Sequence, residues 1–167
     1  SVELSSEVMK EADVILATGG PGMVKAAYSS GKPAIGVGSG NTPIILDSSC
    51  DIKMAVSSII HSKTFDNGTI CASEQAVIVD ASIYDEVKEE FIVRKSYIPK
   101  DEELKQLKEI VLGPNGTMNA KLVGRPATEV AEEAGFEIPK DTKLIIGEAT
   151  SADISEPLSH EKLFPVL

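Results

Sequence analysis

The sequence lacks several features that would assign it to a class at once. No apolar run approaches the roughly 18 residues that a membrane span needs. The only cysteines, Cys50 and Cys71, do not make a disulfide framework, and a reducing, cytoplasmic compartment fits them. Neither histidine stands in metal-ligand spacing with a cysteine, so we expect no metal site. The formal net charge of −10 argues against nucleic acid as a partner.

Acidic residues are missing from one long stretch. The chain has 26 acids, yet none lies between Val14 and Leu46, where the only charges are Lys25 and Lys32. An acid-free, glycine-rich segment that opens a helix suits an anion, because the first N–H groups of a helix are unpaired and its dipole is positive there. The alternative is that buried strands simply exclude acids. The run Gly19-Gly20-Pro21-Gly22 is not a G-x-G-x-x-G fingerprint, so its spacing alone does not define a dinucleotide site.

The remaining composition is that of a folded protein. The 167 residues are 42% hydrophobic and 25% charged, an ordinary globular balance with enough length for a core. Ser1 is no start methionine and the chain closes on an apolar run, so we interpret it as a fragment of a longer protein. A change from glycine-rich to long charged segments near 47–51 suggests a boundary between domains at 1–48 and 49–167.

Alternating strand and helix patterns predict an α/β domain with a largely parallel sheet. We expect a short buried strand at 12–17, two more short apolar runs at 34–37 and 43–46, and strands at 75–80 and 143–146. We expect helices at 23–29, after Asp51, after a capping box at Ser82–Asp85, around Leu104–Val111 and at 126–135. The Asp51 helix carries its apolar residues at helical spacing, at positions 52, 55, 56, 59 and 60.

Cys71 is the best candidate for a reactive atom. Asn67-Gly68 is a strong turn signal, which would place Cys71 on a tight loop between an apolar helix and a strand. Backbone N–H groups in such a loop lower a thiol pKa and can face a carbonyl oxygen. The alternative is that both cysteines are small packed hydrophobic residues, and Cys50, next to a helix cap, fits that description. His61, on the polar side of its helix, is expected to be structural.

The segment from Phe65 to Gln75, FDNGTICASEQ, resembles the nucleophile segment of the CoA-acylating aldehyde dehydrogenases. It is most similar to the aldehyde dehydrogenase half of bifunctional aldehyde-alcohol dehydrogenases. Three more segments resemble this family in the same order, at 17–24, 36–43 and 160–166. The resemblance implies the following: Cys71 is the nucleophile, residues 1–48 end an NAD-binding domain, residues 49–167 belong to a catalytic domain, and the full-length enzyme is a homo-oligomer. It places NAD at Thr18, Gly19, Gly20, Gly38 and Glu161.

Gly36 bears on the acceptor of the acyl group. Hydrolytic aldehyde dehydrogenases carry a glutamate near this position, and here no acid is available as a base for water. A thioester on Cys71 would then persist until coenzyme A takes the acyl group. Glu74 could replace the missing base, which leaves an alternative open. For Glu161, a solvated charged turn at 160–162 is the other interpretation.

The sequence therefore predicts an NAD-dependent enzyme that interconverts acetaldehyde and acetyl-CoA through a cysteine thioester, with a small aldehyde and CoA as partners. Two alternatives remain open: another aldehyde or semialdehyde as substrate, and a non-catalytic fragment that serves assembly. Because the resemblance places adenosine recognition upstream of Ser1, we expect the isolated 167-residue chain to be essentially inactive.

Overall fold

A computed structural model describes residues 2–167, which form two compact units that meet in sequence between Gly40 and Asn41. The unit boundary precedes the change in composition at 47–51 because β3 (Thr42–Leu46) pairs with β4 (Glu74–Val79) and so joins the second unit. The identity of each part as a nucleotide-binding or catalytic domain remains a prediction.

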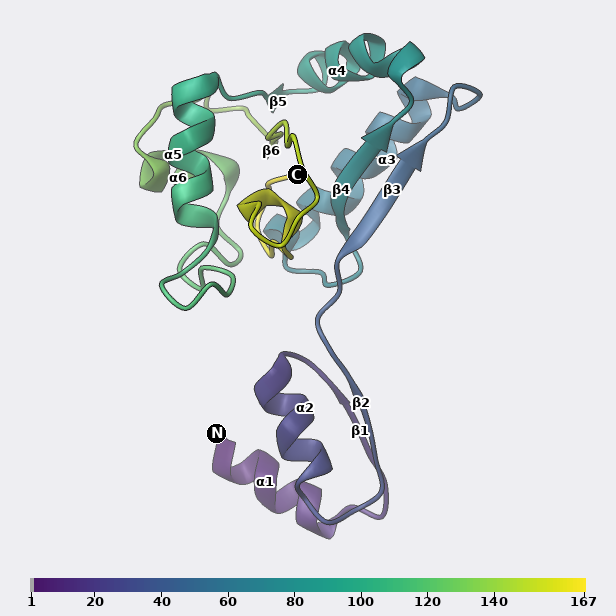
Figure 1. The fold of residues 1–167 in the computed structure, drawn as a ribbon, viewed down its shortest axis with the longest axis vertical. Helices are drawn as coiled ribbons and strands as arrows, with labels where there is room; N and C mark the ends of the chain where they lie inside the picture. Colours follow the sequence, from purple (N-terminus) through teal and green to yellow (C-terminus); the bar gives the residue numbers. More distant parts are fainter. Residues whose placement is uncertain (1) are drawn as a thin grey trace. The chain divides into compact units, whose positions relative to one another are not determined.

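The first unit is a β-α-β arrangement preceded by a helix. Its elements are α1 (Val2–Glu11), β1 (Ile15–Thr18), α2 (Pro21–Tyr28) and β2 (Ala34–Val37). The strands run parallel, from Ile15 opposite Ala34 to Thr18 opposite Val37, and both helices lie on the same side of them (Figure 1). Parallel neighbours need a crossover connection, which α2 provides.

The first strand differs from the expectation in two ways. The chain is helical to Glu11, so the strand begins at Ile15 and not at residue 12. Its side chains alternate: Ile15 and Ala17 are buried with Ala27, whereas Leu16 is 75% exposed. The strand is therefore half-buried, because the helices of this unit cover only one of its faces. Helix α1 was absent from the sequence-based assignment.

The second unit opens with another parallel pair. Helix α3 (Ile52–Thr64) connects β3 to β4, and Asp51 caps it as predicted, accepting a hydrogen bond from the Met54 N–H at 3.0 Å. Val56, Ile59 and Ile60 on this helix are buried and pack in one core cluster with Leu46, Phe91 and Leu167. The predicted apolar stripe is confirmed, and it positions the end of α3 beneath the start of β4.

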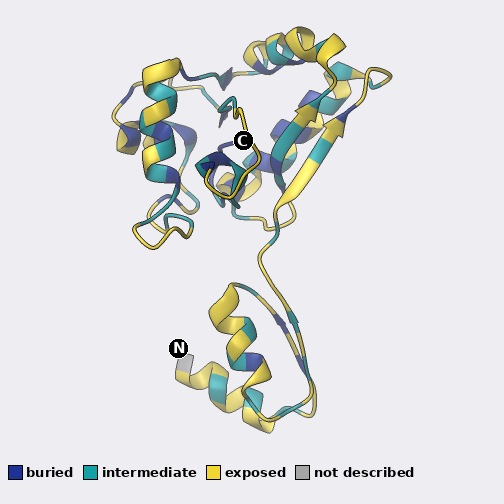
Figure 2. Ribbon diagram, in the orientation of Figure 1, coloured by how far each residue is buried: buried dark blue, intermediate teal, exposed yellow. Residues whose placement is uncertain are grey.

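The rest of the second unit packs around a short third pair of parallel strands, as the dark core positions in Figure 2 show. Helix α5 packs against α6, with Leu107, Val111 and Val130 fully buried between them. The elements of the second unit besides β3, α3 and β4 are η1 (Phe65–Gly68), η2 (Ala81–Ile83), α4 (Tyr84–Val93), β5 (Ser96–Tyr97), α5 (Asp101–Val111), α6 (Ala127–Ala134), β6 (Leu144–Ile145) and η3 (Pro157–Ser159).

One predicted cap is wrong and one helix end is confirmed. The chain enters α4 through the turn η2, where Asp80 accepts hydrogen bonds from the backbone and the hydroxyl of Ser82, so Ser82 is no capping box. Helix α6 ends at Gly135, whose φ of 93° is in the left-handed region that favours glycine. The fold as a whole is α/β with parallel strand pairs, as predicted.

Candidate active site

Cys71 lies on an exposed loop between η1 and β4, where the turn signal places it. Asp66 and Asn67 have φ values of 48° and 49°, an uncommon conformation outside glycine, and the Thr69 hydroxyl donates to the Asp66 backbone carbonyl at 2.9 Å. Within residues 2–167, the backbone N–H groups of Cys71 and Ala72 donate to no acceptor. The loop can therefore present both a thiol and free N–H groups to a carbonyl substrate.

Gly68 lets this loop approach the C-terminal segment closely. Its φ is 81°, and a Cβ at this position would lie 2.8 Å from the carbonyl carbon of Phe164, a backbone atom. Asn67 adds a second tie, since its side-chain amide donates to the Gly124 carbonyl at 3.0 Å, and the Gly124 N–H donates to the Leu163 carbonyl at 3.0 Å. The loop of Cys71 and the segment that follows Glu161 are thus held together.

Glu161 is half-buried, as is His160 before it, whereas Lys162 after it is fully buried. The Lys162 ammonium donates to three backbone carbonyls: Gln75 at 3.0 Å, Leu158 at 2.6 Å and His160 at 2.9 Å. This segment is not the solvated charged turn of the alternative interpretation, because its lysine points inward. Whether Glu161 binds a ribose remains a proposal.

Lys63, at the end of α3, is the second fully buried lysine. Its ammonium donates to the Lys162 carbonyl at 2.7 Å and to Gln75 Oε1 at 3.1 Å. Burial, together with the charge of Lys162, lowers the pKa of Lys63 to about 7, against an opposing effect of Glu74 and Glu161. Burial lowers the pKa of Lys162 to about 8, and Glu156 opposes this shift. The start of β4 is therefore flanked by two buried lysines whose pKa values are lowered.

The predicted phosphate-side residues lie together at one end of the first sheet. Thr18 pairs with Val37, and the Gly19 N–H donates to the Val37 carbonyl at 3.0 Å, so Gly19 and Gly38 follow the carboxyl ends of adjacent parallel strands. Ligands of α/β sheets bind at such strand ends. Gly20 caps α2, and a Cβ at Gly20 or Gly38 would meet no atom within 4 Å. The open space and the Gly22 N–H, which donates to no acceptor within residues 2–167, fit a dinucleotide phosphate.

Gly36 is enclosed. A Cβ at this position would lie 2.8 Å from the ring of Tyr28 and 2.8 Å from Val24 Cγ1. The Tyr28 hydroxyl also accepts a hydrogen bond from the Gly36 N–H at 3.1 Å. An acidic side chain cannot occupy this position without displacing Tyr28, which agrees with the absence of a base here.

The other candidates take no part in this arrangement. Cys50 packs against the core cluster of α3, and His61 is exposed. A pocket along β4 is lined by residues such as Val87, Phe91 and Glu148, and neither Cys71 nor Glu161 lines it. Within residues 2–167 no group of three or more histidine, cysteine, aspartate or glutamate side chains could hold a metal ion, and no helix is long and apolar enough to cross a membrane.

Sequence reasoning missed Lys63 and Gln75. A signal for Lys63 existed: it follows Ile59 and Ile60 by four and three positions and so continues the apolar stripe of α3. A lysine on the buried face of a helix needs acceptors in the interior. Gln75 is the second residue of β4, and its two lysine partners lie 12 and 87 positions away, so no local pattern could have found them.

The α/β fold of this chain, with its parallel strand pairs, is that of the aldehyde dehydrogenases. The sequence profile of the aldehyde dehydrogenase family matches residues 10–144, and the chain belongs to this family. It is 58% identical along its whole length to the bifunctional aldehyde-alcohol dehydrogenase AdhE of Escherichia coli (strain K12), of which it spans 19%.

Solved structures agree with this assignment. An acetylating aldehyde dehydrogenase from Geobacillus thermoglucosidasius superposes on the whole chain with a TM-score of 0.94 and 51% identity, and the chain covers 37% of it. A propionaldehyde dehydrogenase from Rhodopseudomonas palustris, solved with bound CoA and an acylated cysteine, has a TM-score of 0.87 and 31% identity, with 99% of this chain and 38% of that chain covered. The chain thus spans well under half of the proteins that it matches.

Proposed function

We propose that this chain provides the thiol loop and part of the nucleotide site of an NAD-dependent, CoA-acylating aldehyde dehydrogenase that interconverts acetaldehyde and acetyl-CoA. The observation that carries the proposal is Cys71 itself, an exposed thiol on a loop with unpaired backbone N–H groups directly before β4. The solved relative that carries an acylated cysteine and CoA supports the same chemistry.

Cys71 is the nucleophile. Its thiolate attacks the aldehyde carbonyl carbon, and the C=O electron pair moves to the oxygen, where the Cys71 N–H stabilises the negative charge. NAD⁺, when bound, would supply the acceptor for the hydride of this carbon. Loss of the hydride lets the oxygen re-form the carbonyl, which leaves a thioester on Cys71. The sulfur of a CoA thiolate then attacks the thioester carbon, and the Cys71 thiolate leaves.

The enclosed Gly36 supports CoA over water as the acceptor. Without an aligned base, a thioester hydrolyses slowly, whereas a thiol is an intrinsically stronger nucleophile. Glu74, the alternative base, starts β4 with its Oε2 buried and, in the described part of the chain, without a hydrogen-bond partner. We infer that Glu74 stabilises the protonated form of Lys63 and does not serve as a base for water.

The proposed nucleotide contacts are those that the family resemblance implies. Thr18, Gly19, Gly20 and Gly38 are proposed to bind the phosphate and nicotinamide end of NAD. Glu161 is proposed to accept hydrogen bonds from the nicotinamide ribose. The full-length enzyme is proposed to be a cytoplasmic homo-oligomer.

The test uses the full-length parent enzyme. With acetaldehyde and NAD⁺, we expect NADH formation to depend on CoA, with at most one turnover per site in its absence. Cys71→Ala should abolish this activity, whereas Cys50→Ala should retain it because Cys50 is packed in the core. Limiting iodoacetamide followed by mass spectrometry should label Cys71 before Cys50.

Two results would refute the proposal. Sustained acetate production without CoA would make the enzyme hydrolytic, with Glu74 as the leading base. Full activity of Cys71→Ala would remove the nucleophile. Higher kcat/KM for a longer aldehyde or a semialdehyde would leave the chemistry intact and replace only acetaldehyde as the substrate.

A further inference from the structure

The backbone on either side of Glu161 is held at three points. The His160 carbonyl accepts from the Lys162 ammonium at 2.9 Å, the Lys162 N–H donates to Gln75 Oε1 at 2.8 Å, and the Lys162 carbonyl accepts from the Lys63 ammonium at 2.7 Å. The side chains of Lys63, Gln75 and Lys162 are all buried. The backbone on both sides of Glu161 is therefore held against α3 and β4 by buried side chains.

The same side chains reach the thiol loop. Gln75 lies four residues after Cys71 on β4, and Lys63 lies at the end of α3, just before η1. Gln75 Oε1 accepts from both the Lys63 ammonium and the Lys162 N–H. A displacement of Glu161 must therefore disturb the first residues of β4, to which the Cys71 loop is attached.

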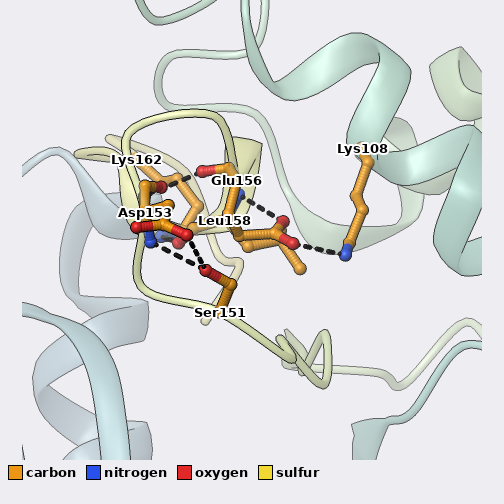
Figure 3. Close-up of polar contacts among 7 residues, drawn as sticks. Lys108, Ser151, Asp153, Glu156, Leu158 and Lys162 are labelled. Carbon is orange, nitrogen blue, oxygen red and sulfur yellow. Dashed lines mark hydrogen bonds and ion pairs between the residues drawn. The ribbon is translucent and has the colours of Figure 1, made fainter.

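The two buried lysines differ in the number of acceptors around the side-chain nitrogen. Lys162 Nζ has three acceptors, which match the three N–H groups of an ammonium, whereas Lys63 Nζ has two acceptors, which match the two N–H groups of a neutral amine. A chain of contacts also links Lys162 to α5 (Figure 3). The Lys162 ammonium donates to the Leu158 carbonyl, and the Leu158 N–H donates to the Glu156 carboxylate. Glu156 in turn forms an ion pair with Lys108.

We propose that Lys63, Gln75 and Lys162 are positioning residues, which set the place of Glu161 relative to Cys71 and so the approach of the nicotinamide to the thiohemiacetal carbon. The inference rests on the proposed function, because it assigns Glu161 to the nicotinamide ribose. It adds a buried set of residues that touch neither the aldehyde nor the nucleotide.

Gln75 offers the sharpest variants for a test in the full-length enzyme. Gln75→Leu has a similar volume and removes the acceptor. Gln75→Glu keeps an oxygen acceptor and replaces the Nε2, which has no partner within residues 2–167, by a second oxygen beside two lysines. We expect Gln75→Leu to lower kcat/KM for NAD⁺ by up to about a hundredfold, the effect of a misplacement of about 1 Å, and Gln75→Glu to restore most of it.

Two further readouts separate positioning from loss of folding. The primary isotope effect with deuterated acetaldehyde should increase in Gln75→Leu and in Lys63→Met, because hydride transfer becomes slower. The rate of Cys71 alkylation by iodoacetamide should stay within about twofold of the parent, since the thiol loop remains folded. Lys88→Met, which breaks an exposed ion pair with Glu148, is the matched control and should leave the isotope effect and the KM for NAD⁺ unchanged.

The inference fails if Gln75→Leu folds and retains the parent KM for NAD⁺ and the parent isotope effect. It also fails if Gln75→Glu lowers kcat/KM for NAD⁺ as much as Gln75→Leu does, because the oxygen acceptor at position 75 would then not be the cause of the loss. A parent enzyme with no CoA-dependent NADH formation would instead sink the proposed function, so the two failures are distinguishable.

Discussion

Gly68→Ala tests the contact that joins the thiol loop to the C-terminal segment. Two costs add at this position. Alanine at a φ of 81° costs about 1–2 kcal/mol relative to its preferred conformations. The new Cβ would also lie 2.8 Å from the Phe164 carbonyl carbon, and Phe164 is fully buried, so its backbone cannot retreat freely. Such overpacking costs about 1–3 kcal/mol.

Gly116→Ala is the matched control. Its φ of 70° imposes the same conformational cost, but a Cβ there would meet no atom within 4 Å. We therefore expect Gly68→Ala to lower the free energy of unfolding by about 2–5 kcal/mol and Gly116→Ala by about 1–2 kcal/mol.

Urea unfolding of the 167-residue chain, followed by circular dichroism, measures this difference. With m values of about 1–3 kcal/mol/M, the midpoint of Gly68→Ala should fall below that of Gly116→Ala by about 1 M. The Cys71 alkylation rate should change only in Gly68→Ala, because only that change displaces the thiol loop. Equal midpoints and equal alkylation rates for the two variants would refute the close approach.

Two further predictions concern pH and Gly36. The pKa values of Lys63, about 7, and Lys162, about 8, lie below the unfolded value of 10.5, so the unfolded chain binds more protons between these values. The free energy of unfolding should thus rise by a few kcal/mol from about pH 7 to about pH 9.5, and Lys63→Met should flatten the rise. Lys63 faces Lys162, Glu74 and Glu161, and Lys162 faces Glu156. A flat parent profile in urea titrations would contradict the burial of the two ammonium groups. Gly36→Ala should lower the urea midpoint by the equivalent of about 1–3 kcal/mol because its Cβ meets Tyr28, whereas Gly38→Ala should stay within about 0.5 kcal/mol; equal midpoints would show that Tyr28 yields at little cost.

Local patterns in the sequence were enough for most of the secondary structure. The stripe at 52–60 and the cap at Asp51 correctly predicted α3, and Asn67-Gly68 correctly predicted the turn before Cys71. Helix α1 was missed because its apolar residues make no clear stripe: Leu4 and Val8 are exposed, whereas Met9 packs against the core of the β-α-β unit.

Features that depend on distant parts of the chain were out of reach. Gln75 and Lys162 are 87 positions apart, and only the folded chain places the amide oxygen of one beside the N–H of the other. The tightness at Gly36 likewise depends on how the Tyr28 ring folds back from α2. The parallel pairing of strands followed from their alternation with helices, whereas the contact of Gly68 with Phe164 did not follow from any spacing.

The acceptors of Lys162 have a consequence for how related sequences can diverge. All three are main-chain carbonyls, which every residue type possesses, so replacements at Leu158 and His160 leave this hydrogen bonding in place. Lys162 itself has no substitute, because arginine lacks the compact three-proton head and methionine has no donor. These hydrogen bonds therefore place no demand on side-chain type in the turn that precedes Glu161, where Leu158 is constrained instead by its buried side chain. Relatives should be aligned through the lysine and not through the turn.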